Sequence, residues 1–162
     1  MSYQFTFPYT KKEIPPKGDF PARVRYVPLL KTFLSYNKKL SLIFPSIVDS
    51  GADYCIFPAN IAEDVGLDIE KGKKLPMHGI GGEDLIYFHK VKVSVDIEDA
   101  TWQFDCPVGF SRGMSLKGVG YLGRSGFFDL FKMVSFMEED HKVVLTTEGD
   151  KPSTFKQGGP LF

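Results

Sequence analysis

Short apolar runs separated by turn residues recur along the chain, and they predict strands rather than long helices. Residues 89–96 and 101–108 alternate between apolar and polar side chains, as half-buried strands do. Apolar runs on both sides of a turn predict two further hairpins, one within 23–44 and one within 133–146. The pattern therefore favours a mainly β fold.

Two short segments depart from this pattern and predict helices. Over 58–65, Pro58 suits the first helical turn and Gly66 fits just past the end. A second helix is expected from about Gly126. It would carry three large apolar residues on one side: Phe127, Leu130 and Phe131.

The composition indicates a single soluble globular domain. The chain has 162 residues, of which 43% are hydrophobic and 25% charged. A net charge of zero gives no electrostatic case for a nucleic-acid partner. No apolar run approaches the ~20 residues of a membrane span, and the first residues do not resemble a signal peptide, so a cytoplasmic location is expected. Cys55 and Cys106 have apolar neighbours and are expected to be buried as small hydrophobic residues.

A small polar island, residues 49–53, lies between two apolar runs. The β-branched Ile47 and Val48 predict the end of a buried strand, and Asp49 follows it directly. A carboxylate in that position is costly unless other groups are arranged around it. Gly51 permits a tight turn and a close approach of the backbone. The sequence therefore places Asp49 on the floor of a site.

A second informative segment, residues 75–88, has two apolar arms around the glycine-rich centre 78–82. It predicts a hairpin with a glycine-rich tip. Two interpretations are open. The tip is either a plain turn or a mobile flap whose backbone amides approach a bound substrate strand.

Three segments in this order resemble the retroviral-type (retropepsin-like) aspartic proteases of the bacterial and cellular single-domain branch. The catalytic loop of that family has Asp, then Ser or Thr, then Gly, often followed by Ala-Asp. The chain reads Val-Asp-Ser-Gly-Ala-Asp at 48–53 and Tyr-Leu-Gly-Arg at 121–124, where the family has an apolar-Leu/Ile-Gly-Arg segment before its C-terminal helix. The resemblance spans about 23–145. It implies a closed acid-protease barrel with a flap hairpin, one short helix after the active loop and one C-terminal helix.

The resemblance implies an aspartic endopeptidase that hydrolyses peptide bonds without a cofactor or a metal. Its catalytic residues would be Asp49, Ser50 and Gly51. Two carboxylates held in contact share a proton, so that one activates water while the other donates to the scissile carbonyl. Because the chain has one such triplet, a symmetric homodimer with one Asp49 from each subunit is expected. The Ser50 hydroxyl would hydrogen-bond across the two-fold axis.

A polypeptide substrate would bind as an extended strand between the flap and the active loop. The residues expected to contact it are Ala52 and Asp53 from the loop, and Gly79, Ile80 and Gly81 from the flap. The resemblance also implies structural support from Gly123 and Arg124, with the Arg124 guanidinium pairing with the Asp53 carboxylate.

Residues 1–22 are proline-rich and are expected to form an extended arm with little core, followed by the protease domain over 23–146 and a loose tail over 147–162. The segment 111–118 is longer than the corresponding loop of the minimal retroviral enzyme, and Ser125 stands where that enzyme carries Asn or Asp. A catalytically inactive module of the same fold, binding a peptide or ligand in its groove, is therefore the alternative.

Two other kinds of site have weaker support. Residues 109–113 match the Gly-x-Ser-x-Gly pattern of serine hydrolases, with Asp129 and His141 further along the chain. That pattern requires a helix after the serine, and the glycine-broken 114–120 disfavours one. The cysteines and histidines show no close-paired spacing of metal ligands, so no metal site is expected.

Overall fold

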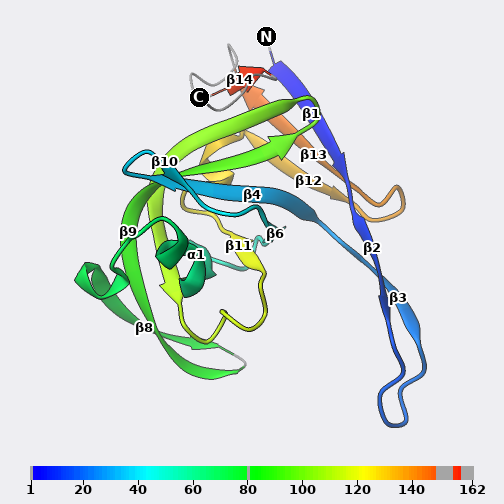
Figure 1. Ribbon diagram of the computed structural model, residues 1–162. Coiled ribbons are helices and arrows are strands. Elements are labelled where there is room, and N and C mark those ends of the chain that lie inside the picture. The colour runs from blue at the N-terminus through cyan, green and yellow to red at the C-terminus, as the bar shows by residue number, and fades with distance from the viewer. Residues whose placement is uncertain (1, 80, 149–154, 158–162) are drawn as a thin grey trace.

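The computed structural model describes residues 2–79, 81–148 and 155–157 (Figure 1). It is mainly β, with 62% strand and 8% helix. Six strands close into a barrel: β4 (Leu29–Tyr36), β6 (Phe44–Val48), β7 (Cys55–Pro58), β9 (Gly82–Ile97), β10 (Ala100–Ser111) and β11 (Gly120–Leu122). Their order is β10-β7-β11-β6-β4-β9, and β9 pairs with β10 to complete the circle. The expected closed barrel is confirmed.

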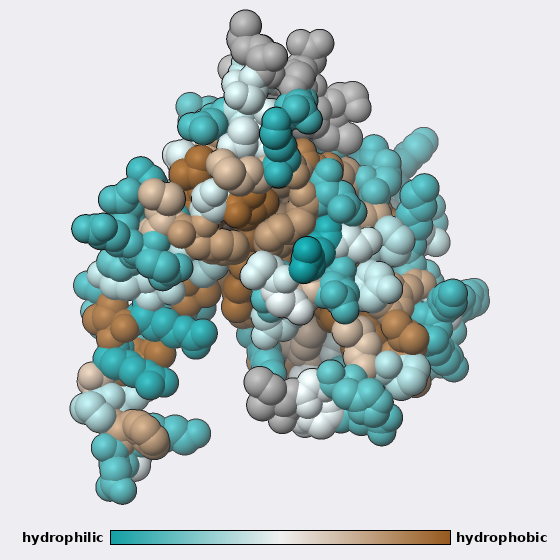
Figure 2. All heavy atoms as spheres, turned by 180° about the vertical axis from the view of Figure 1, so that it is seen from behind, coloured by the Kyte–Doolittle hydropathy of each residue, from teal (hydrophilic) through white to brown (hydrophobic). Residues whose placement is uncertain are grey.

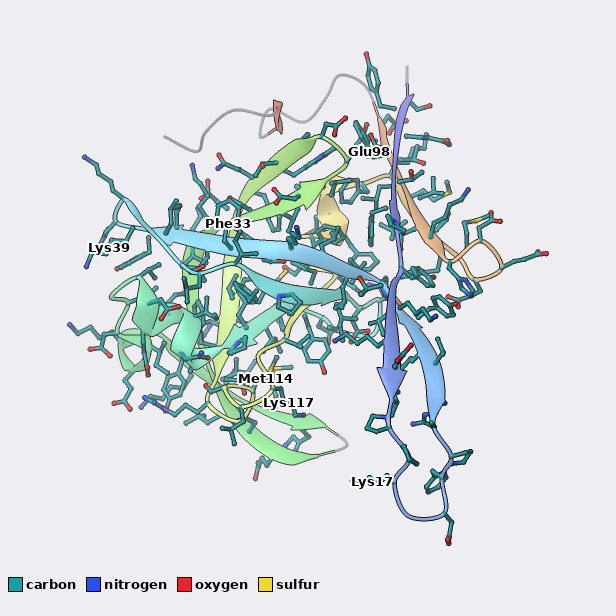
Figure 3. All side chains as sticks on the ribbon, turned by 45° about the vertical axis from the view of Figure 1, so that its right-hand side comes forward. Lys17, Phe33, Lys39, Glu98, Met114 and Lys117 are labelled. Atoms are coloured by element: carbon teal, nitrogen blue, oxygen red, sulfur yellow. The ribbon has the colours of Figure 1, made fainter. Side chains whose placement is uncertain are left out.

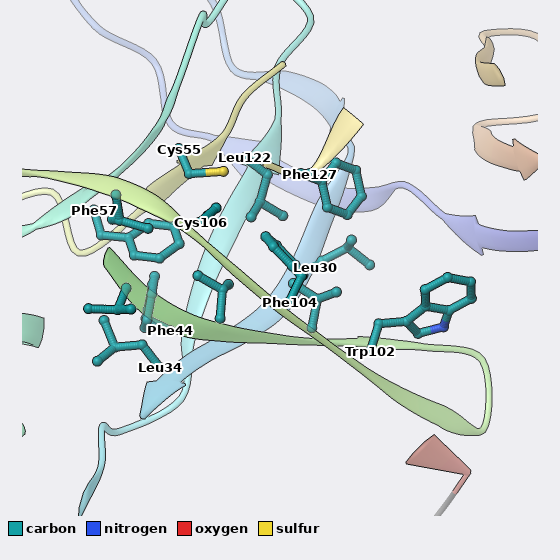
Figure 4. Close-up of a cluster of buried hydrophobic side chains, with 14 of the residues drawn as sticks. Leu30, Leu34, Phe44, Cys55, Phe57, Trp102, Phe104, Cys106, Leu122 and Phe127 are labelled. Atoms are coloured by element: carbon teal, nitrogen blue, oxygen red, sulfur yellow. The ribbon is translucent and has the colours of Figure 1, made fainter. Parts of the chain in front are cut away.

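The barrel interior is filled by large apolar side chains, most of which alternate along the strands. Figure 4 shows part of this core, including Leu34, Phe57, Phe104, Leu122 and Phe127. Alternation places every second residue inside, so the alternating runs at 89–96 and 101–108 formed β9 and β10 as expected.

Both cysteines are buried in this core, as expected, and both are free thiols. The neighbouring Cys55 sulfur and burial together raise the pKa of the Cys106 thiol well above its ordinary value. Cys106 is therefore a neutral packing residue rather than a nucleophile.

A smaller antiparallel sheet packs against one end of the barrel. Its order is β1-β13-β12, with β1 (Ser2–Pro8), β12 (Met133–Met137) and β13 (Lys142–Glu148). β12 and β13 form the hairpin expected within 133–146. The expectation of little core in residues 1–22 is wrong for β1, because Phe5 and Phe7 are buried and Phe5 meets the Trp102 ring edge-on at 4.8 Å.

The next two strands, β2 (Thr10–Ile14) and β3 (Arg23–Val27), form a two-stranded antiparallel ribbon. This β2–β3 ribbon projects from the barrel on the right of Figure 1. Lys17 lies near its tip in Figure 3, clear of the barrel that carries Met114 and Lys117. Part of the proline-rich arm is thus a structured hairpin.

The first helix forms where it was expected, as α1 (Ala59–Asp64), with Gly66 in the left-handed conformation just past its end at φ 74°. The expected helix after Gly126 is only one 3-10 turn, η2 (Phe128–Leu130), because Phe131 already returns to an extended conformation. A further 3-10 turn, η1 (Ile69–Lys71), precedes the flap. In the ranges that the structure describes, no helix has the length and apolarity needed to cross a bilayer.

Three short strands complete the fold: β5 (Lys39–Leu40) beside β4, β8 (Lys73–Gly79) beside β9, and β14 (Phe155–Gln157) beside β10. β14 lies within the tail that was expected to be loose, and its backbone pairs with residues 100–102. The division of the chain into arm, domain and tail at residues 22 and 146 stays a prediction.

Candidate active site

Asp49 lies at the end of β6, directly after the buried Val48. The late strand β11 is inserted between β6 and β7, parallel to β6 and bridged antiparallel to β7. The Asp49 amide donates to the Leu122 carbonyl at 3.1 Å and so continues this parallel pairing one residue past β6. Asp49 is therefore held by backbone pairing with β11, and it is half-buried.

A tight turn orients the Asp49 carboxylate. The Gly51 amide donates to Asp49 Oδ1 at 2.9 Å, and the Ala52 amide donates to the Asp49 carbonyl at 3.2 Å. A Cβ at position 51 would lie 3.2 Å from Asp49 Oδ1, which is tighter than an ordinary contact, so glycine suits this approach. Ser50 and Gly51 are both exposed. The turn presents one oriented carboxylate and the exposed Ser50 at the barrel surface.

The 121–124 segment supports this loop through its backbone. The Arg124 amide donates to the Ala52 carbonyl at 2.8 Å, and the Ser125 amide donates to the Asp53 carbonyl at 2.8 Å. Gly123 is required here, because a Cβ would collide with the Tyr54 carbonyl and lie 2.8 Å from the Ala52 oxygen.

The side-chain pair expected between Arg124 and Asp53 is not found in the ranges that the structure describes, and both residues are exposed. The two segments meet instead through two main-chain hydrogen bonds between the 49–53 loop and residues 124–125, which hold the loop in place without an ion pair.

The flap is the hairpin of β8 and β9, whose last pair joins Gly79 to Gly82. Gly82 has a φ of 108°, a conformation that L side chains rarely adopt. A Cβ at Gly79 or Gly81 would meet nothing within 4 Å, so the tip is open on both sides. Ile80, the third expected flap contact, lies outside the described residues.

An apolar cluster joins the flap to the active loop, and the sequence analysis did not identify it. Three residues are buried in it and four more pack against them: Ile56, Ile86 and Met114, with Tyr54, Met77, Phe88 and Tyr121. The Tyr54 and Phe88 rings meet nearly edge-on, with centroids 5.1 Å apart. Because Tyr54 directly follows the 49–53 loop, this cluster forms an apolar wall that begins one residue past the loop. The sequence indicated two apolar arms within 75–88, but only the strand pairing shows what these arms contact.

A second unforeseen contact ties the flap to the 111–118 loop. The Ser111 hydroxyl donates a short hydrogen bond to Asp84 Oδ2 of the flap and accepts one from the Met114 amide at 3.1 Å. Ser111 is fully buried and is followed by a loop rather than a helix. His141 stacks on Tyr26 at the ribbon instead of approaching Ser111. The serine-hydrolase interpretation is therefore wrong, and Ser111 is a structural tether.

The remaining histidines have ordinary structural partners. His78 Nε2 lies 3.6 Å from Glu83 Oε1 across the flap, where both side chains are exposed. His89 Nε2 lies 2.8 Å from the Ile69 carbonyl oxygen. In the described parts of the chain, no three His, Cys, Asp or Glu residues are grouped as metal ligands would be.

No protein-family model matches the chain, and no curated protein matches it in sequence. Solved structures do match its fold. One of them is a retropepsin-like aspartic protease from Rickettsia conorii, with a TM-score of 0.52 and 18% identity. The match covers 84% of this chain and 98% of that chain. At this identity the likeness establishes the fold alone, and the chain has the general fold of the retropepsin-like aspartic proteases.

Proposed function

We propose that the protein is an aspartic endopeptidase that works as a homodimer, with Asp49 from each copy forming the catalytic pair. One observation carries the proposal. A carboxylate oriented by the Gly51 amide stands at the surface next to the exposed Ser50, in a barrel of the retropepsin-like fold with a glycine-tipped flap. The fold in general implies a dimer and a peptide substrate. A single chain supplies half of such a pair.

The chemistry follows from two carboxylates that share one proton. The ionised Asp49 takes a proton from water, and the oxygen of that water bonds to the scissile carbonyl carbon. The protonated Asp49 of the other copy gives its proton to the carbonyl oxygen. The resulting tetrahedral diol then breaks its carbon–nitrogen bond: the now ionised carboxylate takes the proton of one diol hydroxyl, which becomes the new carbonyl, while the protonated carboxyl gives its proton to the leaving nitrogen. The Gly51 amide keeps the carboxylate in place throughout.

The substrate is proposed to be an extended polypeptide that adds a strand between the loop and the flap. Ala52 and Asp53 of the loop and Gly79 and Gly81 of the flap are proposed to line its two sides, and the two flap glycines, whose Cβ positions are open, leave room for a close approach. The apolar wall around Tyr54 favours apolar side chains next to the cleaved bond.

The decisive experiment compares the native protein with Asp49→Asn against a peptide library, with products read by mass spectrometry over acidic to neutral pH. We expect cleavage to fall on the order of 10³-fold or more, since the variant loses the acid–base pair. Asp99→Asn, an exposed carboxylate elsewhere on the barrel, is the matched control and should cleave normally. Equal activity of the native and Asp49→Asn proteins would refute the proposal.

Peptide binding without cleavage is the competing function, and one contact favours it. The Ser111–Asp84 tether restrains the flap against the 111–118 loop and so restricts its opening. The same library decides between the two. Peptides that are retained equally by native protein and Asp49→Asn, with no cleavage at any pH, would establish the binding module.

A further inference from the structure

The β2–β3 ribbon exposes apolar side chains that its own chain does not cover. Every residue from Thr10 to Tyr26 is exposed except Ile14, which is half-buried. Phe20 is 70% exposed and Val24 49%. A two-stranded hairpin is marginally stable at best without packing on one face. Figure 2 shows the ribbon standing clear of the body, with apolar residues between hydrophilic ones.

The base of the ribbon is nevertheless fixed to the body. The Tyr26 ring stacks on the His141 ring at 3.7 Å and 8°. The Tyr9 hydroxyl donates to Glu138 Oε1 at 2.7 Å, and the Tyr9 amide donates to the His141 carbonyl at 2.7 Å. These contacts hold both strands of the ribbon against the β12–β13 turn. Its direction is set before any partner binds, which lowers the entropy cost of binding one.

The ribbon leaves the barrel next to the active loop. The Val48 amide, one residue before Asp49, donates to the carbonyl of Pro28, which directly follows β3, at 2.9 Å. Leu29 then pairs with Ile47 in the adjoining strand. A second copy that brings its own Asp49 to this loop must therefore sit close to the base of the ribbon.

The charge of the ribbon complements that of the rest of the chain. Between Tyr9 and Val27 there are five basic and two acidic side chains, a net charge of +3: Lys11, Lys12, Lys17, Arg23 and Arg25 against Glu13 and Asp19. The whole chain has a net charge of zero, so the remainder carries −3. The ribbon of one copy is thus attracted to the body of another.

We propose that the β2–β3 ribbon clasps the body of a second copy of this chain, each copy giving one ribbon and receiving one about the two-fold axis. This rests on the proposed function, because it is the Asp49 pair that calls for a second copy. The exposed ribbon face binds the partner subunit. This clasp stabilises the dimer in addition to the contacts between the two active loops.

Truncating the ribbon at its base tests the clasp. Lys12 and Arg25 are directly paired, so residues 13–24 can be replaced by Asn-Gly, which closes a two-residue hairpin turn and leaves Tyr9 and Tyr26 in place. We expect sedimentation equilibrium to show a dimer dissociation constant raised on the order of tenfold or more. Circular dichroism should show an intact barrel. Unchanged dimerisation of the truncated protein overturns the proposal.

Charge reversal gives a matched pair of variants. The double variant Arg23→Glu, Arg25→Glu should weaken the dimer and reduce the dependence of dimerisation on salt. The control is Lys90→Glu, Lys92→Glu, which reverses two exposed lysines on β9 and should not weaken the dimer. A photo-reactive benzoylphenylalanine in place of Phe20 should give a covalent dimer on irradiation. Crosslinks found only within one chain contradict the clasp.

Two readouts separate the clasp from the catalytic proposal. A native dimer that is weakened by truncation but cleaves no peptide supports the clasp and refutes the endopeptidase. An active dimer that is indifferent to truncation refutes the clasp and leaves the endopeptidase standing. A native protein that remains monomeric at high concentration refutes both.

Discussion

The 49–53 loop and the β2–β3 ribbon leave the barrel at the same edge, but they are held in opposite ways. The loop is fixed on both sides by backbone hydrogen bonds from the 122–125 segment. The ribbon is anchored at its base by Tyr9 and Tyr26, and its outer part is exposed to solvent. One region is completed by its own chain, whereas the other is exposed and is proposed to bind a second copy.

This difference concerns what each region has to do. A catalytic carboxylate must stand in one orientation to within a fraction of an ångström, and main-chain pairing within a barrel provides that. A clasp must reach a surface that belongs to another molecule, so its apolar residues stay exposed until that surface arrives. Substitutions in the loop should therefore disturb folding and activity, while substitutions in the ribbon should disturb association alone.

Gly123→Ala should have the largest effect. The added methyl group would collide with the Tyr54 carbonyl, a backbone group that cannot move without breaking the Arg124–Ala52 hydrogen bond. We expect a loss of about 3 kcal/mol or more in the free energy of unfolding, the upper range for overpacking. Urea denaturation measures it, and residual protein should lack peptidase activity.

Gly79→Ala is the control for that prediction, because a Cβ there meets nothing within 4 Å. Its free energy of unfolding should change by less than about 0.5 kcal/mol, as for other surface positions. If Gly79→Ala and Gly123→Ala lower the free energy of unfolding equally, the 49–53 loop is not held by close packing of its backbone against that of Gly123.

Ser111→Ala should have the next largest effect, since it leaves the Asp84 carboxylate and the buried Met114 amide without their partner. We expect the unfolding free energy to fall by about 1–3 kcal/mol. The flap should also become more mobile, which hydrogen exchange of β8 measures. Ser115→Ala lies in the same loop and removes no side-chain hydrogen bond found in the described residues, so it should change neither quantity.

Tyr9→Phe tests the anchor between ribbon and body through pH. Burial, and then the hydrogen bond to Glu138, raise the pKa of Tyr9 to about 12. An unfolded tyrosine ionises near pH ~10, so the contribution of Tyr9 to stability is complete below that pH and is lost as pH rises toward 12. Native protein should lose stability more steeply than Tyr9→Phe across this window. Parallel curves of stability against pH would contradict the anchor.

Val24→Ser should have the smallest effect on the folded monomer. Val24 is 49% exposed on the ribbon. The free energy of unfolding should therefore change by less than about 0.5 kcal/mol when it is measured at a protein concentration below the dimer dissociation constant. A larger loss would show that the ribbon packs on its own barrel and would remove the contrast between the two regions.

The sequence was sufficient to predict the local features of the fold. The alternation along 89–108 predicted β9 and β10, and Pro58 with Gly66 predicted α1, because these signals depend on neighbouring residues. The Asp49 turn was predicted for the same reason: a buried strand, a carboxylate and a glycine follow one another in the chain.

Contacts between segments that are distant in the sequence could not be predicted from neighbouring residues. Arg124 was assigned an ion pair with Asp53, whereas the two segments meet through main-chain groups that every residue carries. Ser111 and Asp84 gave no signal of their tether, which depends on the register of β9 against β10. Phe5 and Phe7 lay in a proline-rich segment, and only pairing with β13 shows why they are buried.

The insertion of β11 between β6 and β7 also determines at what stage of synthesis the Asp49 loop can be held in place. A chain that is being synthesised completes β6 and the Asp49 turn long before residues 120–125 exist to hold them. Until that late strand pairs with β6, the Asp49 turn lacks its backbone hydrogen bonds to residues 122–125. A chain that ends before residue 120 therefore lacks the backbone partners of the Asp49 loop, and under the proposed function we expect it to cleave no peptide.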